Sequence, residues 1–152
     1  METILEGIIN KVVYICRVKK VLVVCDTNSI LSPLAAAYID RFKKCKAEVY
    51  SFGIDAKPIN GAVIELLKED TITQEFNIIY SLSELHSYEF DYIISLSANA
   101  NTFIEKEFKA ALKFNYNFKI PDIEIKESLT DLRSDIKQYF ERFCKMYLNE
   151  YQ

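Results

Sequence analysis

The sequence predicts an α/β fold: a single doubly wound domain in which a four-stranded parallel sheet is flanked by helices. A chain of 152 residues, 50% of them hydrophobic, is long enough for one domain with a substantial core. Short, continuous apolar runs are typical of strands that are buried on both faces of a parallel sheet. These runs alternate with longer segments of helical periodicity, which is the pattern of βαβ units.

Strands are expected at residues 21–25, 47–52, 92–96 and, from a weaker pattern, 112–116. The first and third read Val-Leu-Val-Val-Cys and Tyr-Ile-Ile-Ser-Leu, and both are short, unbroken apolar segments of the kind that forms buried strands. The second strand is expected to stop at Gly53. Connections between parallel strands cross over in the right-handed sense, so we expect helices on both faces of the sheet.

Helices are expected between these strands. Ser32 is a favourable N-cap and Pro33 is favoured at the first helical position, so the first helix is expected to open there. The later helices are expected at residues 61–67, at residues 100–111, and from a cap at Ser128 or Thr130 to residue 147.

The chain is expected to divide at one point, into an N-terminal extension of residues 1–18 and a domain of residues 19–152. Ile4, Ile8 and Val12 have helical spacing within the extension, although residues 12–16 also fit an extended segment. The extension is therefore expected to cover its own domain or to recruit another subunit, and the oligomeric state is left open.

Composition excludes several classes of protein. The net charge of −3 and the pI near 5.3 leave no basic footprint, so we expect no nucleic-acid partner. No apolar run approaches the ~20 residues of a membrane helix. The acidic start is unlike a secretory signal, so we expect a cytoplasmic protein with no membrane partner.

The cysteines also limit the chemistry. Cys16, Cys25, Cys45 and Cys144 include no CxxC pair, and His86 is the single histidine. Zinc sites in proteins are usually built from several cysteine and histidine ligands at short spacing. We therefore expect no metal site and no cofactor.

The segment that follows the first strand is the candidate ligand-binding loop. Ligands of parallel α/β sheets bind beyond the carboxyl ends of the strands. A helix that begins there offers free N–H groups and the positive end of its dipole, which favour an anion. The strand ends at Cys25, and the loop comprises Asp26, Thr27, Asn28, Ser29, Ile30, Leu31 and Ser32.

Residues 21–37 read VLVVCDTNSILSPLAAA. This segment resembles the phosphate-binding loop of the low-molecular-weight protein tyrosine phosphatases, in which a strand is followed by C-x5-R-[ST]-P and a helix. Three further segments resemble landmarks of that family in the same order: residues 50–53, residues 90–94 and residues 120–123. The likeness covers roughly residues 20–148.

The resemblance implies a reaction in which a cysteine thiolate attacks phosphorus and forms a thiophosphate intermediate. Loop N–H groups and an arginine hold the equatorial oxygens, and a late aspartate protonates the leaving group and then activates water. By this resemblance, Cys25 matches the nucleophile and Asp122 the general acid. Asn28 and Ser32 match residues that brace the loop and the thiolate, and Ser51 matches a further loop-bracing hydroxyl.

Departures from the family pattern change this expectation. Leu31 stands at the arginine position, Thr27 at a glycine and Ile30 at a second cysteine. Asp26 adds a negative charge next to the nucleophile, and Ile123 replaces the proline after the general acid. Loss of such an arginine typically costs ~10³–10⁵ in the rate of phosphoryl transfer.

We therefore expect a phosphatase-like protein with crippled or lost activity, acting as a binding or regulatory module. Its partners would be phosphate or a small anion, bound weakly, or another protein. The alternative is a weak Cys-dependent phosphomonoester phosphatase that uses Cys25 and Asp122. Lys57 is the best local substitute for the missing cation, since Arg41 lies more than two turns down the first helix.

Arsenate reduction is the least favoured alternative. Reductases on this fold pair the loop cysteine with a second and a third cysteine on a mobile segment. The corresponding stretch, residues 77–89, contains no cysteine. Cys16, Cys45 and Cys144 lie on elements that are not expected to reach Cys25.

Overall fold

The computed structural model of the protein describes residues 18–73, 78–109, 111–122 and 124–149. The expected helical spacing within residues 1–17 lies outside the described residues, as do Cys16 and Ile123. The elements are β1 (Lys19–Cys25), α2 (Leu31–Phe42), β2 (Ala47–Gly53), α3 (Gly61–Glu69), α4 (Leu82–His86), β3 (Tyr92–Ser95), α5 (Ala98–Glu107), β4 (Leu112–Asn115) and α6 (Lys126–Tyr147).

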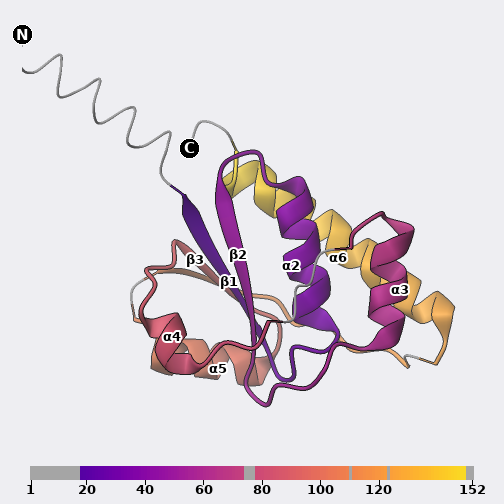
Figure 1. The fold of residues 1–152 in the computed structure, drawn as a ribbon, viewed down its shortest axis with the longest axis horizontal. Coiled ribbons are helices and arrows are strands. Elements are labelled where there is room, and N and C mark those ends of the chain that lie inside the picture. Colours follow the sequence, from indigo (N-terminus) through magenta and orange to yellow (C-terminus); the bar gives the residue numbers. More distant parts are fainter. Residues whose placement is uncertain (1–17, 74–77, 110, 123, 150–152) are drawn as a thin grey trace, which may run out of the picture.

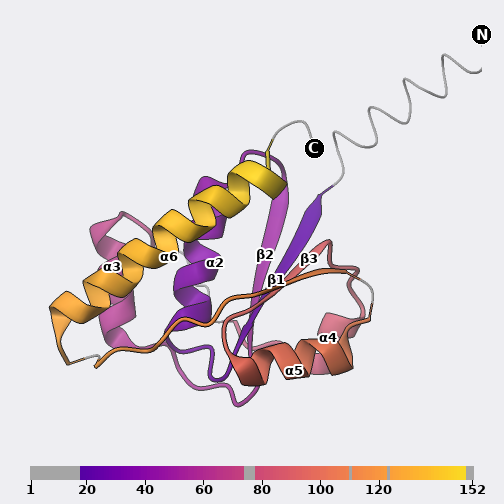
Figure 2. The same ribbon diagram turned by 180° about the vertical axis from the view of Figure 1, so that it is seen from behind.

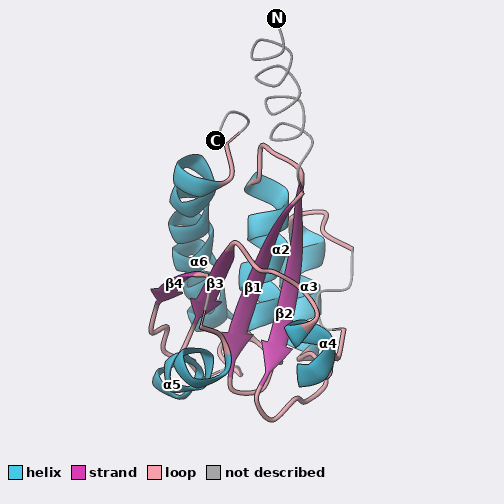
Figure 3. Ribbon diagram, turned by 90° about the vertical axis from the view of Figure 1, so that its left-hand side faces the viewer, coloured by secondary structure: helices cyan, strands magenta, loops and turns pink. Residues whose placement is uncertain are grey.

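All four strands pair in parallel, in the order β2-β1-β3-β4 (Figure 3). The register sets Leu22 of β1 beside Tyr50 of β2 and Ile93 of β3. Because β1 lies inside the sheet and is covered on both faces, its residues 21–24 are completely buried. The predicted single α/β domain with a four-stranded parallel sheet is confirmed.

Helices cover the two faces of the sheet in separate groups (Figures 1 and 2). Strand residues point to alternate faces, so Val21 and Val23 join a core with α2, α3 and α6. Leu22 and Val24 face the other way and pack with Leu85 of α4 and with α5. Among the described residues, no helix is both long and apolar enough to span a bilayer.

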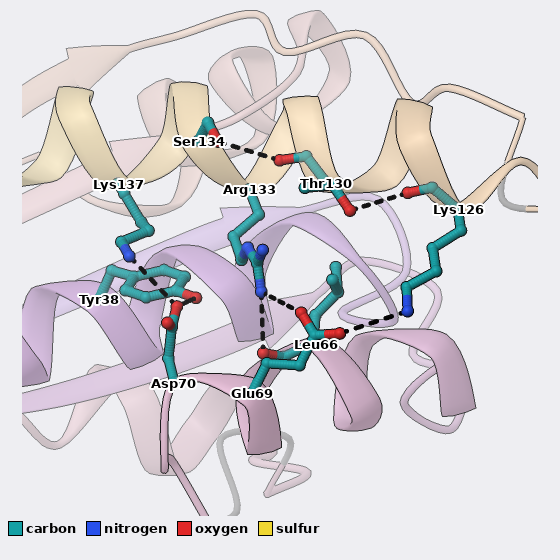
Figure 4. A network of polar contacts seen from close by, with 9 residues as sticks. All are labelled: Tyr38, Leu66, Glu69, Asp70, Lys126, Thr130, Arg133, Ser134 and Lys137. Atoms are coloured by element: carbon teal, nitrogen blue, oxygen red, sulfur yellow. Dashed lines mark hydrogen bonds and ion pairs between the residues drawn. The ribbon is translucent and has the colours of Figure 1, made fainter.

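The longest helix, α6, is held to α2 and α3 by a network of polar contacts (Figure 4). Arg133 of α6 lies 2.7 Å from the carboxylate of Glu69, and Lys137 lies 3.3 Å from that of Asp70. Tyr38 of α2 donates a hydrogen bond of 2.6 Å to Asp70. Burial alone would raise the pKa of Asp70, but the bonds from Tyr38 and Lys137 lower it overall.

Several element boundaries differ from the sequence-based expectation. Helix α2 begins at Leu31, and Ser32 lies inside its first turn rather than at its cap. Helix α6 begins at Lys126, with Ile125 at the cap position, so Ser128 and Thr130 are already helical. Helix α5 begins at Ala98 and ends at Glu107, two residues and four residues earlier than expected.

The short helix α4 lies in a stretch for which the sequence analysis predicts neither a helix nor a strand. Its Ser81 accepts a hydrogen bond of 3.1 Å from the Glu84 amide, which caps the first turn. Leu85 is completely buried and anchors the helix to the sheet. A five-residue helix with one buried side chain has no periodic signal, which is why the sequence pattern did not predict it.

Candidate functional site

The loop between β1 and α2 is held in shape by the segment that follows β2. Four amides of residues 54–60 donate to the carbonyl of Cys25 and to the carbonyls of three loop residues. The donor–acceptor pairs are Ile54–Cys25 (3.1 Å), Asp55–Asp26 (2.8 Å), Lys57–Thr27 (2.9 Å) and Asn60–Ser29 (3.0 Å). With the carbonyls engaged on this side, the amides of Thr27, Ser29 and Ile30 donate to no acceptor within the described residues.

A buried cluster of three side chains closes the loop around a thiol. The Sγ atom of Cys25 lies 2.8 Å from Oγ of Ser32, and the Asn28 amide donates to the same sulfur over 3.1 Å. Ser32 also donates a 2.7 Å hydrogen bond to Oδ1 of Asn28. The three residues predicted to form the thiol site are therefore brought together, and each is at least 96% buried.

Two backbone features permit this tight loop. Asn28 has a φ angle of 53°, in the left-handed region that asparagine tolerates better than most residues. Gly53, at the end of β2, lies directly against the loop: a Cβ atom there would be 2.6 Å from the carbonyl carbon of Thr27 and 2.7 Å from the amide nitrogen of Asn28. The absence of a side chain at Gly53 therefore allows the loop to reach its shape.

Leu31 is the first residue of α2, and its side chain belongs to the apolar core. Only 4% of the residue is exposed, and it packs in the same cluster as Cys25, Ile30 and Leu34. The position at which the family pattern has arginine is therefore filled by a buried hydrocarbon side chain. Leucine carries no charge, so this position supplies no cation to an anion held by the loop amides.

Asp26 is connected to the opposite face of the sheet. Its Oδ1 atom accepts a 3.0 Å hydrogen bond from the hydroxyl of Ser97. The same hydroxyl accepts from the Ala100 amide and caps α5. A carboxylate at a helix N-terminus is stabilised by the helix dipole, so this contact ties the loop to α5.

Ser97 is a residue that sequence reasoning missed. It lies two residues after β3, and the carboxyl ends of neighbouring parallel strands meet at one edge of the sheet. That rule would have placed Ser97 near the end of β1, but not its contact with Asp26.

Three other predicted site residues lie in β2, in the segment after β2 and before α6. Ser51 is 4% exposed and pairs with Val23, two residues before the end of β2. Lys57 contributes its amide to the loop, whereas its exposed side chain makes no hydrogen bond or ion pair with any described residue. Asp122 is exposed and accepts from the amides of Glu124 and Ile125, which begins the turn into α6.

The arginines in the described part of the chain are Arg41, Arg133 and Arg142. Arg41 donates to the carbonyl of Asp70, and Arg133 pairs with Glu69. Arg142 is an exposed residue of α6, and Arg17 lies outside the described residues. No arginine in the described part of the chain hydrogen-bonds to the loop.

Cys144 lies far from Cys25. It is completely buried and its thiol donates to the carbonyl of Ile39, over 3.5 Å. Ile39 follows Leu31 by eight residues of helix, a rise of about 12 Å. Burial, followed by the neighbouring Cys45, raises the pKa of the Cys144 thiol to about 12. Across the described residues, no group of acidic, cysteine or histidine side chains is arranged to hold a metal ion.

In a doubly wound α/β domain, a loop with free amides between a buried strand and a helix N-terminus is an arrangement that favours anions. The sequence model of the family described as "Low molecular weight phosphotyrosine protein phosphatase" matches residues 20–145. The chain therefore belongs to this family. No curated protein sequence matches it.

Solved structures of this fold include several with different activities. An arsenate reductase in its oxidized state is 19% identical, with a TM-score of 0.72, and 84% of this chain and 98% of that one are covered. The YwlE arginine phosphatase of Geobacillus stearothermophilus is 18% identical, with a TM-score of 0.70 and coverage of 84% and 92%. The tyrosine phosphatase Wzb of Escherichia coli K30, in complex with sulphate, is 15% identical, with a TM-score of 0.67 and coverage of 84% and 97%. Identities this low establish the shared fold alone.

Proposed function

We propose that the chain is a binding or regulatory module built on the phosphatase fold, with phosphatase turnover lost or strongly reduced. The observation that carries this proposal is the burial of Leu31, 4% exposed, in the apolar core at the arginine position. The fold and the thiol cluster are retained, whereas the charge that would neutralise a phosphoryl group is missing.

Magnitudes support a loss of turnover rather than a modest reduction. An arginine at a phosphoryl-transfer site contributes ~10³–10⁵ in rate, because it stabilises charge that develops on the equatorial oxygens. Lysine is a point charge without a planar bidentate fork, so Lys57 could attract an anion but not replace that geometry. Truncating one partner of a buried charge pair typically costs ~2–5 kcal/mol of binding, so a phosphate dianion would be held weakly.

The free loop amides support weak binding of a small anion. Thr27, Ser29 and Ile30 have amides without acceptors among the described residues, at the N-terminus of α2. A helix N-terminus of this kind attracts phosphate-like anions. Among structures of this fold, the tyrosine phosphatase Wzb was solved in complex with sulphate, and an arsenate reductase was solved in the phosphate-binding state.

One observation favours a second candidate, a weak Cys-dependent phosphatase. Cys25, Asn28 and Ser32 keep a closed hydrogen-bonded cluster around the thiol. In one YwlE structure, the serine that replaces the active-site cysteine carries a phosphoryl group. In this alternative Cys25 is the nucleophile and Asp122, from the turn before α6, the general acid.

Hydrolysis of para-nitrophenyl phosphate separates the two candidates. The proposal expects the rate of the wild-type chain to lie close to that of Cys25→Ser. Turnover of the wild type well above that of Cys25→Ser would contradict it and favour the Cys-dependent phosphatase.

Leu31→Arg, with Leu31→Met as the matched control of similar length, shows what was lost. A gain of turnover in Leu31→Arg alone means that the missing charge limits the reaction. An unchanged rate in a folded Leu31→Arg variant means that Thr27, at the glycine position, has also altered the loop. Titration with inorganic phosphate, followed by the NMR shifts of the Thr27, Ser29 and Ile30 amides, measures anion binding directly.

A further inference from the structure

An aromatic cleft lies between the end of β4 and the C-terminal half of α6. Its volume is about 230 Å³.

The cleft is lined by one residue that follows β4 and five residues of α6: Tyr116, Tyr139, Arg142, Phe143, Met146 and Tyr147. We call it the β4–α6 cleft. A volume below the ~300–1,000 Å³ of small-molecule sites suits one large side chain better than a cofactor.

Packed aromatic rings make the walls of the cleft. The rings of Tyr116 and Tyr139 lie edge to face with centroids 3.9 Å apart, and those of Phe143 and Tyr147 lie 5.1 Å apart. Met146 is 60% exposed at the rim. Tyrosine, methionine and arginine are enriched in protein interfaces, and rings that are already packed lose little freedom on binding.

Arg142 gives the β4–α6 cleft a charge. Its guanidinium makes no ion pair with any residue that the structure describes, whereas Arg133 on the same helix pairs with Glu69. Lys145, one turn further along, lies 3.9 Å from Glu141. The unpaired cation beside the aromatic walls is complementary to an acidic group on a partner.

The cleft adjoins an open edge of the sheet. Among the strands of the described residues, β4 pairs with β3 alone and is the outermost on its side (Figure 3). The amides of Leu112 and Tyr116 donate to carbonyls on the β3 side, so alternation turns the backbone groups of Lys113 and Asn115 outward. An extended peptide can pair with such an edge while one side chain enters a neighbouring pocket.

We propose that the β4–α6 cleft and the outer edge of β4 bind an extended segment of a partner protein. The segment carries a large apolar side chain, which fills the cleft, next to an acidic residue, which pairs with Arg142. This inference rests on the proposed binding function and names the chemistry of its partner, but it uses none of the residues of the Cys25 loop.

Selection from a displayed library of random octapeptides against the full chain tests the proposal. The expected result is enrichment of peptides with Asp or Glu next to a large apolar residue. Against a selected peptide labelled with fluorescein, Arg142→Glu is expected to weaken affinity about tenfold or more, because arginines in contact with a partner are frequent hot spots. Lys145→Glu, a charge reversal on the same helix, is expected to change it less than twofold.

Hydrogen exchange followed by NMR tests the pairing with the sheet edge. The amides of Lys113 and Asn115 are expected to become protected in the complex. The proposal is overturned if no acidic peptides are enriched, if both charge reversals weaken binding equally, or if these amides stay unprotected. It is also overturned if sedimentation shows that a second copy of the chain occupies this face.

Cys25→Ser keeps the two proposals apart. It is expected to leave peptide affinity unchanged whatever its effect on the hydrolysis of para-nitrophenyl phosphate. High turnover with intact peptide binding would therefore contradict the proposed loss of activity alone, and absent peptide binding without turnover would contradict this inference alone.

Discussion

Oγ of Ser32 lies 2.8 Å from Sγ of Cys25, although the two residues are 7 positions apart in sequence. Cys25 ends β1 and Ser32 belongs to the first turn of α2, so their contact closes the loop. Leu31 takes no part in this closure, because its side chain packs in the core. The shape of the loop is thus independent of the charge that the family pattern supplies at position 31.

Ser32→Ala is expected to destabilise the domain by about 1–3 kcal/mol, because it leaves Oδ1 of the buried Asn28 without its donor. Urea denaturation measures the free energy of unfolding. Ser29→Ala is the matched control, since no hydrogen bond of the Ser29 hydroxyl is found in the described part of the chain, and a change below about 0.5 kcal/mol is expected there. Equal losses in both variants would argue against the loop closure.

Gly53→Ala is expected to cost about 1–3 kcal/mol, because its Cβ atom would meet the loop backbone at 2.6 Å and force it to shift. Gly61→Ala is the control: nothing lies within 4 Å of a Cβ atom at the start of α3. That variant is expected to be neutral or slightly stabilising, since alanine favours helix. Thermal unfolding of the two variants checks the difference, and a neutral Gly53→Ala would contradict the close approach.

Asp70 is expected to make stability depend on pH. Burial opposes the charge of its carboxylate, but the hydrogen bonds from Tyr38 and Lys137 have the larger combined effect and lower its pKa below the ordinary value of 3.8. A lowered carboxyl pKa adds stability that is fully present above the unfolded-state value and is lost as the pH falls through the folded-state value. Asp70→Asn is therefore expected to cost about 1 kcal/mol at neutral pH and progressively less on acidification.

Urea denaturation at a series of pH values measures this dependence. Glu65→Gln serves as the control, because Glu65 forms only an exposed pair with Lys68 at 3.6 Å. Such pairs contribute little, so a nearly constant, small difference from the wild type is expected. A cost of Asp70→Asn that grows as the pH falls would have the wrong sign for the proposed network.

Cys144 is expected to resist alkylation in the folded protein. Burial raises the pKa of its thiol to about 12, and the thiolate is the reactive form. Peptide mapping after iodoacetamide treatment should show Cys45, which is half-buried, modified well before Cys144. Labelling of Cys144 is expected only in urea, and equal labelling of both thiols under native conditions would contradict its burial.

The fold class and the position of the Cys25 loop could both be predicted from local sequence patterns. Strands such as residues 21–24 are recognisable because burial on both faces demands an unbroken apolar run. The placement of Cys25 before a helix N-terminus follows from the same local pattern, and the departure at Leu31 is visible without coordinates. These features depend on residues that are neighbours along the chain.

Contacts between side chains that are distant in sequence could not be predicted in this way. Ser32 looks like an N-cap in sequence, but its hydroxyl is engaged by Cys25 and Asn28 across the loop. The contact of Asp26 with Ser97 joins residues 71 positions apart and depends on the register of β1 and β3. Such contacts are set by packing between segments, because local propensity does not specify the partner of a polar side chain.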